Sequence, residues 1–280
     1  MTILRTIAEV RARVAEAREA GATVALVPTM GYLHEGHLSL LDIARAQADH
    51  VVMSVFVNPL QFGPSEDLES YPRDLERDRR LAAGRGADAV FAPPLGAMYP
   101  DGRPRVTVDP GPQAGRLCGA FRPGHFAGVL TVVAKLFGIV APDVAVFGAK
   151  DYQQAVLVAR LVTDLDMPVR IALAPLVREP DGLAMSSRNA LLSEAERADA
   201  TALSRGLFAA RAAFAAGERD PARLAAQVSD AVEAADSLRL QYAELVHPET
   251  LEPSPEARAG DVLAAAAFAG ATRLIDNVRL

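Results

Sequence analysis

A His-x-Gly-His motif, formed by His34, Gly36 and His37, is the segment of this chain best suited to phosphate chemistry. It follows an apolar run at 23–27 that ends at Pro28, and a helical pattern of apolar residues comes after it. Where a parallel strand is followed by its helix, free backbone N–H groups and the positive end of the helix dipole attract phosphate. Gly36 leaves the backbone accessible, and the two imidazoles share one helical face. The motif therefore predicts a triphosphate site.

Two further segments carry groups that bind phosphate. Residues 185–188 place two serine hydroxyls beside an arginine, and residues 179–182 before them form a glycine-containing loop able to close over a nucleotide. Taken alone, this segment is equally typical of a helix N-cap. Gly148 and Lys150 end another apolar run, with Gln154 one turn into the next helix. A lysine at such a place is also commonly a solvated surface residue.

Neutral amides at the end of the second central strand indicate a site for a small polar substrate. Asn58 and Gln61 follow the apolar run 51–57, and Tyr71 comes shortly after. Amide groups both donate and accept hydrogen bonds, so they suit the hydroxyl and carboxylate groups of such a substrate. The alternative is a simple Asn-Pro turn in which Gln61 is exposed.

Other chemistry is open to the histidines. Zinc hydrolases place two ligands at i and i+4 in His-Glu-x-x-His, whereas His37 comes one residue earlier, so a metal site would need a third ligand such as His125. The pair could also lie on a helix surface without function. Cys118 and His125 could form a nucleophilic pair, but nothing in the sequence orients the histidine, which favours a buried inert thiol. Neither a P-loop motif nor Gly-x-Gly-x-x-Gly follows the first strand, which argues against a P-loop kinase or an NAD enzyme.

The motifs need a parallel sheet to position them, and the pattern of the chain predicts one. Apolar runs, expected as strands, occur at 23–27, 51–57, 87–92, 144–147 and 169–174. Helical patterns occur at 3–17, 38–44, 74–83, 125–140 and 153–163. Alternation of this kind indicates βαβ units and a mostly parallel sheet, with ligand-binding residues at the carboxyl ends of its strands.

The pattern changes beyond Pro175. A polar loop at 178–188 precedes Ala-rich helical segments at 194–216 and 221–235, and apolar runs follow at 240–246 and 262–267. We therefore predict an α/β domain over residues 1–176 and a smaller α+β domain over residues 177–280, packed around a shared cleft.

The composition is that of an ordinary globular protein. The chain has 280 residues, 50% of them hydrophobic, which is enough for a large core. A net charge of -6 without a basic tail indicates no nucleic-acid partner. Cys118 is the only cysteine, which fits a reducing compartment, and the charged N-terminus does not resemble a signal peptide. The longest apolar segment, 262–271, is about half the length that spans a bilayer, so we expect a soluble, cytoplasmic protein without a membrane partner.

Together, the four motifs resemble those of the pantothenate synthetases, or pantoate-β-alanine ligases, of the nucleotidyltransferase superfamily. The signatures of that superfamily are His-x-Gly-His and a loop similar to Lys-Met-Ser-Lys-Ser. The resemblance runs from Val27 to Asn277, with the motifs in the family's order. Residues 186–189 read Ser-Ser-Arg-Asn, a variation typical of this family, whereas Ala149 departs from the longer polar residue of many relatives.

The resemblance implies both a fold and an activity. A Rossmann-like domain would hold ATP and pantoate, a smaller C-terminal domain would act as a lid, and two chains would form a homodimer. The activity would join pantoate to β-alanine through a pantoyl-adenylate, with ATP as a substrate. Mg2+ would accompany the ATP, bound mainly by phosphate oxygens and water, so its protein ligands stay unassigned.

The resemblance also implies the residues of the site. ATP would be bound by Met30, Gly31, Tyr32, Leu33, His34, Glu35, Gly36, His37, Gly148, Ala149, Lys150, Asp151, Val177, Met185, Ser186, Ser187 and Arg188. Of these, the catalytic residues would be His34, His37, Lys150, Ser186, Ser187 and Arg188. Pantoate and then β-alanine would contact Gln61, with Gln154 and Asn58 also on pantoate and with Tyr71 and Arg122 nearby.

Three rival functions share parts of these motifs. A nucleotidyltransferase that forms no amide would not require Gln61 and Gln154. A nucleotide sensor without activity would not require Lys150 and Arg188, and it would bind ATP without producing AMP. An aminoacyl-tRNA synthetase would need an anticodon-binding extension and a basic face, neither of which is evident in this acidic chain.

Overall fold

The computed structural model describes residues 1–64 and 66–280, and the chain divides into two units. Unit 1 consists of Met1–Gly111, Arg122–Ala149 and Leu157–Pro175, and unit 2 consists of Pro112–Phe121, Lys150–Val156 and Leu176–Leu280. Each unit has a sheet and a hydrophobic core of its own.

The sheet of unit 1 is parallel, with six strands in the order β1-β4-β3-β2-β5-β6. The strands are β1 (Thr2–Leu4), β2 (Val24–Thr29), β3 (His50–Val55), β4 (Ala89–Phe91), β5 (Val144–Gly148) and β6 (Arg170–Ala174). Strand order changes direction at β2, which pairs with β3 on one side and with β5 on the other. In open α/β sheets, ligands bind at the carboxyl ends of the strands at such a switch point. The predicted Rossmann-like sheet is confirmed.

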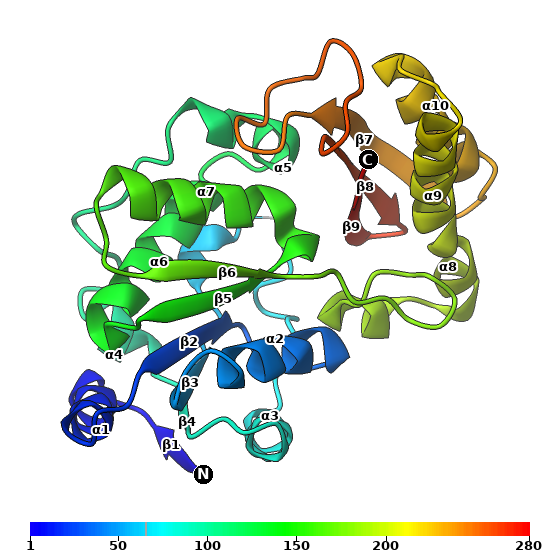
Figure 1. Ribbon diagram of the computed structural model, residues 1–280. Helices are drawn as coiled ribbons and strands as arrows, with labels where there is room; N and C mark the ends of the chain where they lie inside the picture. The colour runs from blue at the N-terminus through cyan, green and yellow to red at the C-terminus, as the bar shows by residue number, and fades with distance from the viewer. Residues whose placement is uncertain (65) are drawn as a thin grey trace. The chain divides into compact units, whose positions relative to one another are not determined.

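Helices cover both faces of this sheet, with α2 and α3 on one face and α6 and α7 on the other (Figure 1). The helices of this part of the chain are α1 (Ile7–Glu19), α2 (Glu35–Arg45), α3 (Leu75–Gly84), α4 (Leu95–Met98), α6 (His125–Val140) and α7 (Tyr152–Asp164). Consecutive residues of β2 point to opposite faces of the sheet and are nevertheless fully buried, because helices cover both faces. This burial explains why the strands read as continuous apolar runs in the sequence.

The first helix begins later than the sequence pattern predicted, because the chain opens with a strand. Residues 2–4 pair with β4, and α1 begins only after Thr6. The Thr6 hydroxyl accepts from the Glu9 N–H at 3.2 Å, and the Glu9 carboxylate accepts from the Thr6 N–H at 2.8 Å. This capping box is a signal in the sequence for a helix start at Ile7. A strand of three residues is too short to show a period of its own.

Unit 2 contains an antiparallel sheet with the strand order β7-β8-β9, and its helices α9 and α10 lie side by side along it (Figure 1). Its elements are α5 (Leu117–Phe121), α8 (Glu194–Asp199), α9 (Thr201–Ala215), α10 (Pro221–Glu233), β7 (Leu238–Val246), β8 (Val262–Ala269) and β9 (Thr272–Arg279). The helices touch at Gly206, where an added Cβ would lie 2.7 Å from Val228 Cα. Only glycine permits so close an approach of two backbones.

Two expectations for unit 2 need correction. The single helix predicted at 194–216 is two helices, α8 and α9, which meet at Ala200. The strand β9 was not predicted, because Arg273, Asp276 and Asn277 interrupt its apolar pattern. Its alternation nevertheless exists in the structure, where Leu274, Asp276 and Val278 are buried and the residues between them are not.

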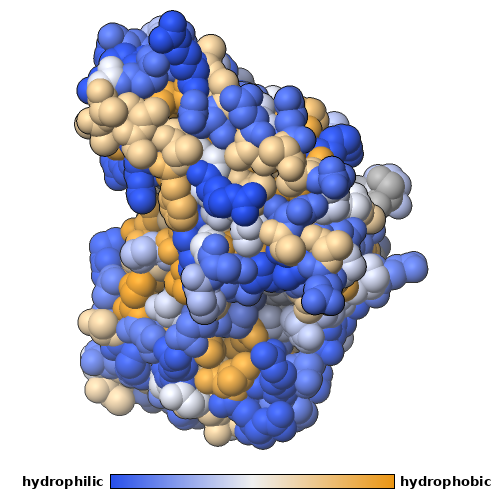
Figure 2. All heavy atoms as spheres, turned by 90° about the vertical axis from the view of Figure 1, so that its right-hand side faces the viewer, coloured by the Kyte–Doolittle hydropathy of each residue, from blue (hydrophilic) through white to orange (hydrophobic). Residues whose placement is uncertain are grey.

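On the face drawn in Figure 2, hydrophilic residues predominate and the hydrophobic ones gather in small groups. Within residues 1–64 and 66–280, none of the helices has the length and apolar character to cross a bilayer.

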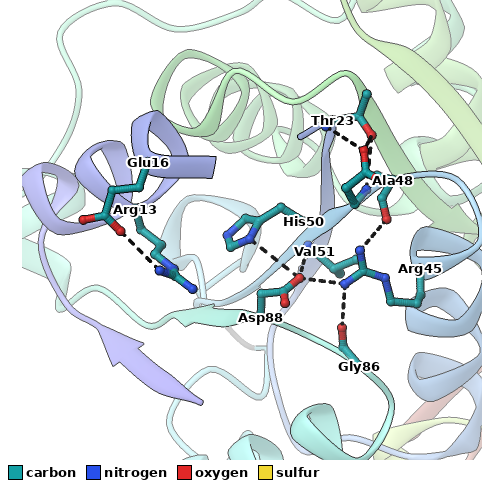
Figure 3. Close-up of polar contacts among 10 residues, drawn as sticks. Arg13, Glu16, Thr23, Arg45, Ala48, His50, Val51, Gly86 and Asp88 are labelled. Carbon is teal, nitrogen blue, oxygen red and sulfur yellow. Dashed lines mark hydrogen bonds and ion pairs between the residues drawn. The ribbon is translucent and has the colours of Figure 1, made fainter. Parts of the chain in front are cut away.

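A buried histidine lies at the start of β3, at the end of the strand opposite to the motifs. His50 Nδ1 is 3.7 Å from the Asp88 carboxylate, which also accepts from Arg45 at 2.8 Å and from the Val51 N–H at 2.7 Å (Figure 3). Burial lowers the pKa of His50 from its ordinary value of 6.5; Asp88 opposes this effect, while Arg13 and Arg45 add to it. His50 is therefore expected to be neutral in the folded protein.

This histidine predicts a pH dependence of stability. Because the pKa of His50 is lower in the folded than in the unfolded chain, its contribution is fully retained above about pH 6.5 and is lost as the pH falls below that value. His50→Gln should remove this part of the pH dependence. Urea unfolding of both proteins at about pH 7.5 and about pH 5.5 measures the difference. If both proteins lose the same free energy of unfolding, His50 is not the group responsible.

Candidate functional site

The loop that joins β2 to α2 has a backbone that requires glycine. Gly31 has a φ of +86° and Tyr32 a φ of 53°, both in the left-handed region. A Cβ at position 31 would lie 2.8 Å from both Asp78 Oδ2 and Val55 Cγ1. Any larger residue would be strained and would also push these neighbours apart. The turn therefore aims the next residues of the motif at the carboxyl end of the sheet.

Asp78, on α3, fixes this loop from behind. Its carboxylate accepts from the Tyr32 N–H and the Leu33 N–H, both at 2.8 Å. Its neighbour Arg77 donates to the Leu33 carbonyl at 2.9 Å, and the guanidinium lies 5.4 Å from the centre of the Tyr32 ring. Burial raises the pKa of Asp78, and the two backbone N–H groups act in the opposite direction. We did not predict this residue, although it shares the buried face of α3 with Ala82, and an aspartate on such a face is a signal.

Removing this carboxylate should loosen the loop. Asp78→Ala leaves the N–H groups of Tyr32 and Leu33 buried without their acceptor, so we expect a loss of about 2 kcal/mol in the free energy of unfolding. Amide hydrogen exchange of residues 32 and 33 should also become faster. Glu76→Ala is the matched control, because Glu76 lies on the same helix in an exposed pair with Arg79. Unchanged exchange at both amides would show that Asp78 does not hold the loop.

The two histidines of the motif lie against each other at the start of α2. His34 precedes the first helical residue, and its backbone N–H donates to His37 Nδ1 at 3.4 Å. The ring centres are 4.0 Å apart, with 36° between the planes. Because Nδ1 of His37 accepts, its neutral ring carries the proton on Nε2 and can donate it to an anion. Both rings are half-buried, and they stand beside the free N–H groups of a helix N-terminus.

Other residues of the loop 30–37 contribute backbone rather than side chains. Glu35 is exposed, and its carboxylate pairs with Arg85 at 2.5 Å, so it is held at the outer surface of α2. Gly36 accepts from Ser39 Oγ at 2.9 Å through its carbonyl. Leu33 is buried in the core of unit 1. The loop can therefore offer N–H groups and two imidazoles to a phosphate.

The amide residues predicted for the substrate lie next to this loop. Gln61 ends the short helix η1 (Pro59–Gln61), and its Nε2 is 3.2 Å from Met30 Sδ. Asn58 is 1% exposed and donates to Gln61 Oε1 at 3.2 Å and to the Gly128 carbonyl at 3.1 Å. Its own oxygen accepts from Tyr99 Oη at 3.0 Å. The structure thus brings Gln61 and Met30 together, with Asn58 behind Gln61 and occupied by protein contacts.

A charged network holds the main chain of Gln61. His125 Nδ1 lies 2.8 Å from the Gln61 carbonyl, and Arg122 donates to the same oxygen at 3.2 Å. Arg122 also pairs with both oxygens of Glu66, at 2.7 and 2.6 Å, and lies 2.9 Å from His125 Nε2. Burial is the largest single effect and raises the pKa of Glu66, but the hydrogen bonds and charge of Arg122, together with the Gly63 N–H and the charge of His125, leave this pKa below its ordinary value. Of these three residues, only Arg122 was placed near the site from the sequence; Tyr71 is buried, with its ring 6.1 Å from that of Phe62.

The third ligand that a zinc site would need has another role here. His125 uses both ring nitrogens on Gln61 and Arg122. Across residues 1–64 and 66–280, no three or more His, Cys, Asp or Glu side chains form a group that could hold a metal ion.

The strand β5 ends beside β2, and its last residues lie at the same edge of the sheet as the histidine loop. Apart from Gly148 itself and its two chain neighbours, the only atom of the described residues within 4 Å of a Cβ built on Gly148 is Leu40 Cδ2, at 3.9 Å. Packing alone does not require glycine there, but a ligand approaching the backbone would. Ala149 follows and is half-buried.

Unit 2 carries the remaining residues that the sequence predicts for nucleotide binding. Lys150 and Asp151 belong to the short helix η3, and the Lys150 carbonyl accepts from Asn277 Nδ2 at 3.1 Å. On α7, Gln154 is half-buried, whereas Gln153 is buried and donates to the carbonyls of residues 113 and 116 at 3.2 and 2.8 Å. Gln154 is thus the more accessible of the two glutamines.

The serine-rich loop is closed at its base. The Val177 carbonyl accepts from the Met185 N–H at 3.0 Å. Ser186 caps the short helix η4 (Ser187–Leu191) by accepting from the Arg188 N–H at 3.3 Å. Ser186 is thus an N-cap, but of η4, whereas the N-cap of the following helix α8 is Ser193. The hydroxyl hydrogen of Ser186 can still be donated. Ser187 is buried, and Arg188 is half-buried.

Comparison with known proteins supports one family. The model of the pantoate-β-alanine ligase family matches residues 2–279. Pantothenate synthetase 1 of Bradyrhizobium diazoefficiens is 52% identical to this chain, over 100% of the chain and 98% of that protein. The crystal structure of pantothenate synthetase from Thermus thermophilus has a TM-score of 0.94 and 48% identity, and the match covers 100% of this chain and 99% of that one.

A third similar protein was crystallised with ligands. It is the pantoate-β-alanine ligase from Francisella tularensis, complexed with β-γ ATP and β-alanine, with a TM-score of 0.82 and 32% identity. The match covers 100% of this chain and 97% of that one. The family model and the identities over whole chains agree with the motifs, their order and the parallel sheet that positions them. The chain belongs to the pantoate-β-alanine ligase family.

Proposed function

We propose that this protein condenses (R)-pantoate with β-alanine at the expense of ATP, giving pantothenate, AMP and pyrophosphate through a pantoyl-adenylate. The observation that carries the proposal is the loop 30–37, which a turn at Gly31 and the Asp78 carboxylate hold at the switch point of the sheet. Gln61 lies against Met30 of the same loop. The Francisella relative, crystallised with an ATP compound and β-alanine, supports the same two ligands for this chain.

The first step activates a carboxylate, which is a poor electrophile. A carboxylate oxygen of pantoate attacks the α-phosphorus of ATP, and the bond from that phosphorus to the bridging oxygen breaks, releasing pyrophosphate. Nε2 of His37 donates to the phosphate oxygens, with His34 beside it. Lys150, Ser186, Ser187 and Arg188 offset further negative charge. Preorganised donors of this kind are usually the largest contribution to catalysis.

In the second step, the amine of β-alanine attacks the carbonyl carbon of the adenylate. The C–N bond forms, the bond to AMP breaks, and the amine loses a proton. Gln61 and Gln154 orient the acid, and the buried Asn58 positions the Gln61 side chain rather than touching the substrate. The C-terminal domain, residues 177–280, acts as a lid that keeps water from the intermediate. A cytoplasmic location and the homodimer implied by the resemblance complete the proposal.

Magnesium enters with the nucleotide. Mg2+ prefers oxygen ligands and keeps several waters, and in nucleotide sites it binds largely through phosphate oxygens. The histidine loop and the Lys150 segment provide donors for phosphate and no cluster of carboxylates. The ion would neutralise charge on the departing pyrophosphate, which these donors also hold.

Pantoate-dependent exchange of labelled pyrophosphate into ATP tests the adenylate directly. Because the first step is reversible, we expect exchange with ATP, Mg2+ and pantoate, without β-alanine. Exchange that is independent of pantoate would instead indicate a different acceptor. ATP binding without any exchange would support the nucleotide-sensor alternative.

A further inference from the structure

The strand β9 carries a carboxylate where its alternation predicts an apolar side chain. Asp276 lies between Leu274 and Val278 on the buried face, and its side chain is 2% exposed. Both oxygens accept from Arg178, at 2.6 and 2.8 Å. Burial raises the pKa of Asp276, and the hydrogen bonds from Arg178 oppose this. Apolar residues in place of a buried ion pair are often neutral or stabilising, so stability alone does not explain the pair.

Arg178 ties this strand to the loop that leads into residues 185–188. It follows Val177 directly and also donates to the Gly182 carbonyl at 3.0 Å, within the loop. Across the base of the loop, the Met185 N–H donates to Val177. The ion pair on β9 therefore fixes the base of the segment that carries the two serines.

The next residue of the strand holds the second nucleotide segment. Asn277 Nδ2 donates to the Lys150 carbonyl at 3.1 Å, while the Asn277 carbonyl accepts from Arg178 at 3.2 Å. The Asn277 N–H also donates to Asp276 Oδ1 at 2.7 Å. Neighbouring residues of one strand thus hold segments that lie far apart in the sequence. All of these contacts lie within unit 2.

We propose that Asn277 and the Arg178–Asp276 pair are positioning residues that set the spacing between Lys150 and residues 186–188 for the phosphates of ATP. This inference rests on the proposed function. Cations and hydroxyls that are already in place before the nucleotide binds need no reorganisation during the reaction. Small misplacements of such groups are costly, reaching about 100-fold for about 1 Å.

Pyrophosphate exchange and calorimetric ATP binding test this with Asn277→Ala. We expect exchange to fall about tenfold or more and ATP to bind more weakly, while the KM for pantoate and the urea unfolding midpoint stay near those of the unaltered protein. Arg279→Ala is the matched control on the same strand, because its side chain also donates to a carbonyl, that of Gly260 at 3.1 Å. Arg279→Ala should leave both pyrophosphate exchange and ATP binding unchanged.

A second variant keeps the test decisive if Asn277→Ala is unstable. Arg178→Met combined with Asp276→Leu replaces the ion pair with apolar side chains of similar size, so it should fold and still lose exchange and ATP affinity. Folded variants with unaltered ATP affinity and exchange would overturn the inference, as would equal losses in Arg279→Ala. If the unaltered protein binds ATP but shows no pyrophosphate exchange, the proposed function is refuted rather than the positioning role. In that case, the ATP affinity of the variants relative to that of the unaltered protein still tests the positioning role.

Discussion

Replacing His37 with alanine lowers the rate of pantoyl-adenylate formation by about 100-fold or more, while the fold is retained. The imidazole accepts a long hydrogen bond from the His34 N–H, at 3.4 Å, and its ring centre lies 4.0 Å from that of His34. Its Nε2–H is the donor that we place on the phosphates. Single-turnover formation of the adenylate from ATP and pantoate is the measurement.

Two further variants separate the donor from the ring. His37→Gln carries an amide donor close to the place of Nε2 and should recover part of the rate. His247→Ala is the matched control, because His247 also accepts backbone N–H groups through Nδ1, from Glu249 and Thr250, but on an exposed loop of unit 2. Near-normal turnover in His37→Ala would remove this residue from the mechanism.

Gly128→Ala should have the second largest effect, although residue 128 contacts no substrate in the proposed mechanism. A Cβ there would lie 2.3 Å from the Leu60 carbonyl oxygen and 2.7 Å from the Gln61 nitrogen. These are backbone atoms that cannot rotate away, so η1 must move and carry Gln61 with it. We expect pantoate-dependent exchange to fall by about 100-fold and the free energy of unfolding by about 1 to 3 kcal/mol.

The same helix offers a matched control. Gly138 is exposed on α6, and among the described residues no heavy atom lies within 4 Å of the position that a Cβ would take there. Gly138→Ala should keep full activity and raise the free energy of unfolding by about 0.5 to 1 kcal/mol through helix propensity. If Gly128→Ala behaved in the same way, α6 would not position Gln61.

The parallel sheet was predictable because its inner strands β2, β3, β4 and β5 are buried on both faces and therefore read as uninterrupted apolar runs. The helix predicted at 125–140 has these same bounds in the structure, since Gly124 and Ala141 adopt left-handed backbone at its two ends. The strands β1 and β9 were missed for opposite reasons. Strand β1 is too short to show an alternation of apolar and polar residues, and β9 has a buried aspartate on its apolar face.

The supports of the site were harder to predict than its motifs. Asp78 is 46 residues from Tyr32 in the sequence, and Glu66 is 56 from Arg122, so no local pattern links either pair. The residues of a motif can be recognised in the sequence because they lie close together in one segment, whose backbone and side chains form the site together. Supporting residues act across the fold, and only the folded chain brings Asp78 of α3 to Tyr32 and Glu66 to Arg122.

Condensation of pantoate with β-alanine can be followed by product analysis in which each substrate is omitted in turn. With ATP, Mg2+, pantoate and β-alanine, we expect AMP and pantothenate in equal amounts, and no pantothenate when any one of the three substrates is left out. ATP binding without AMP from any combination of these substrates would contradict it.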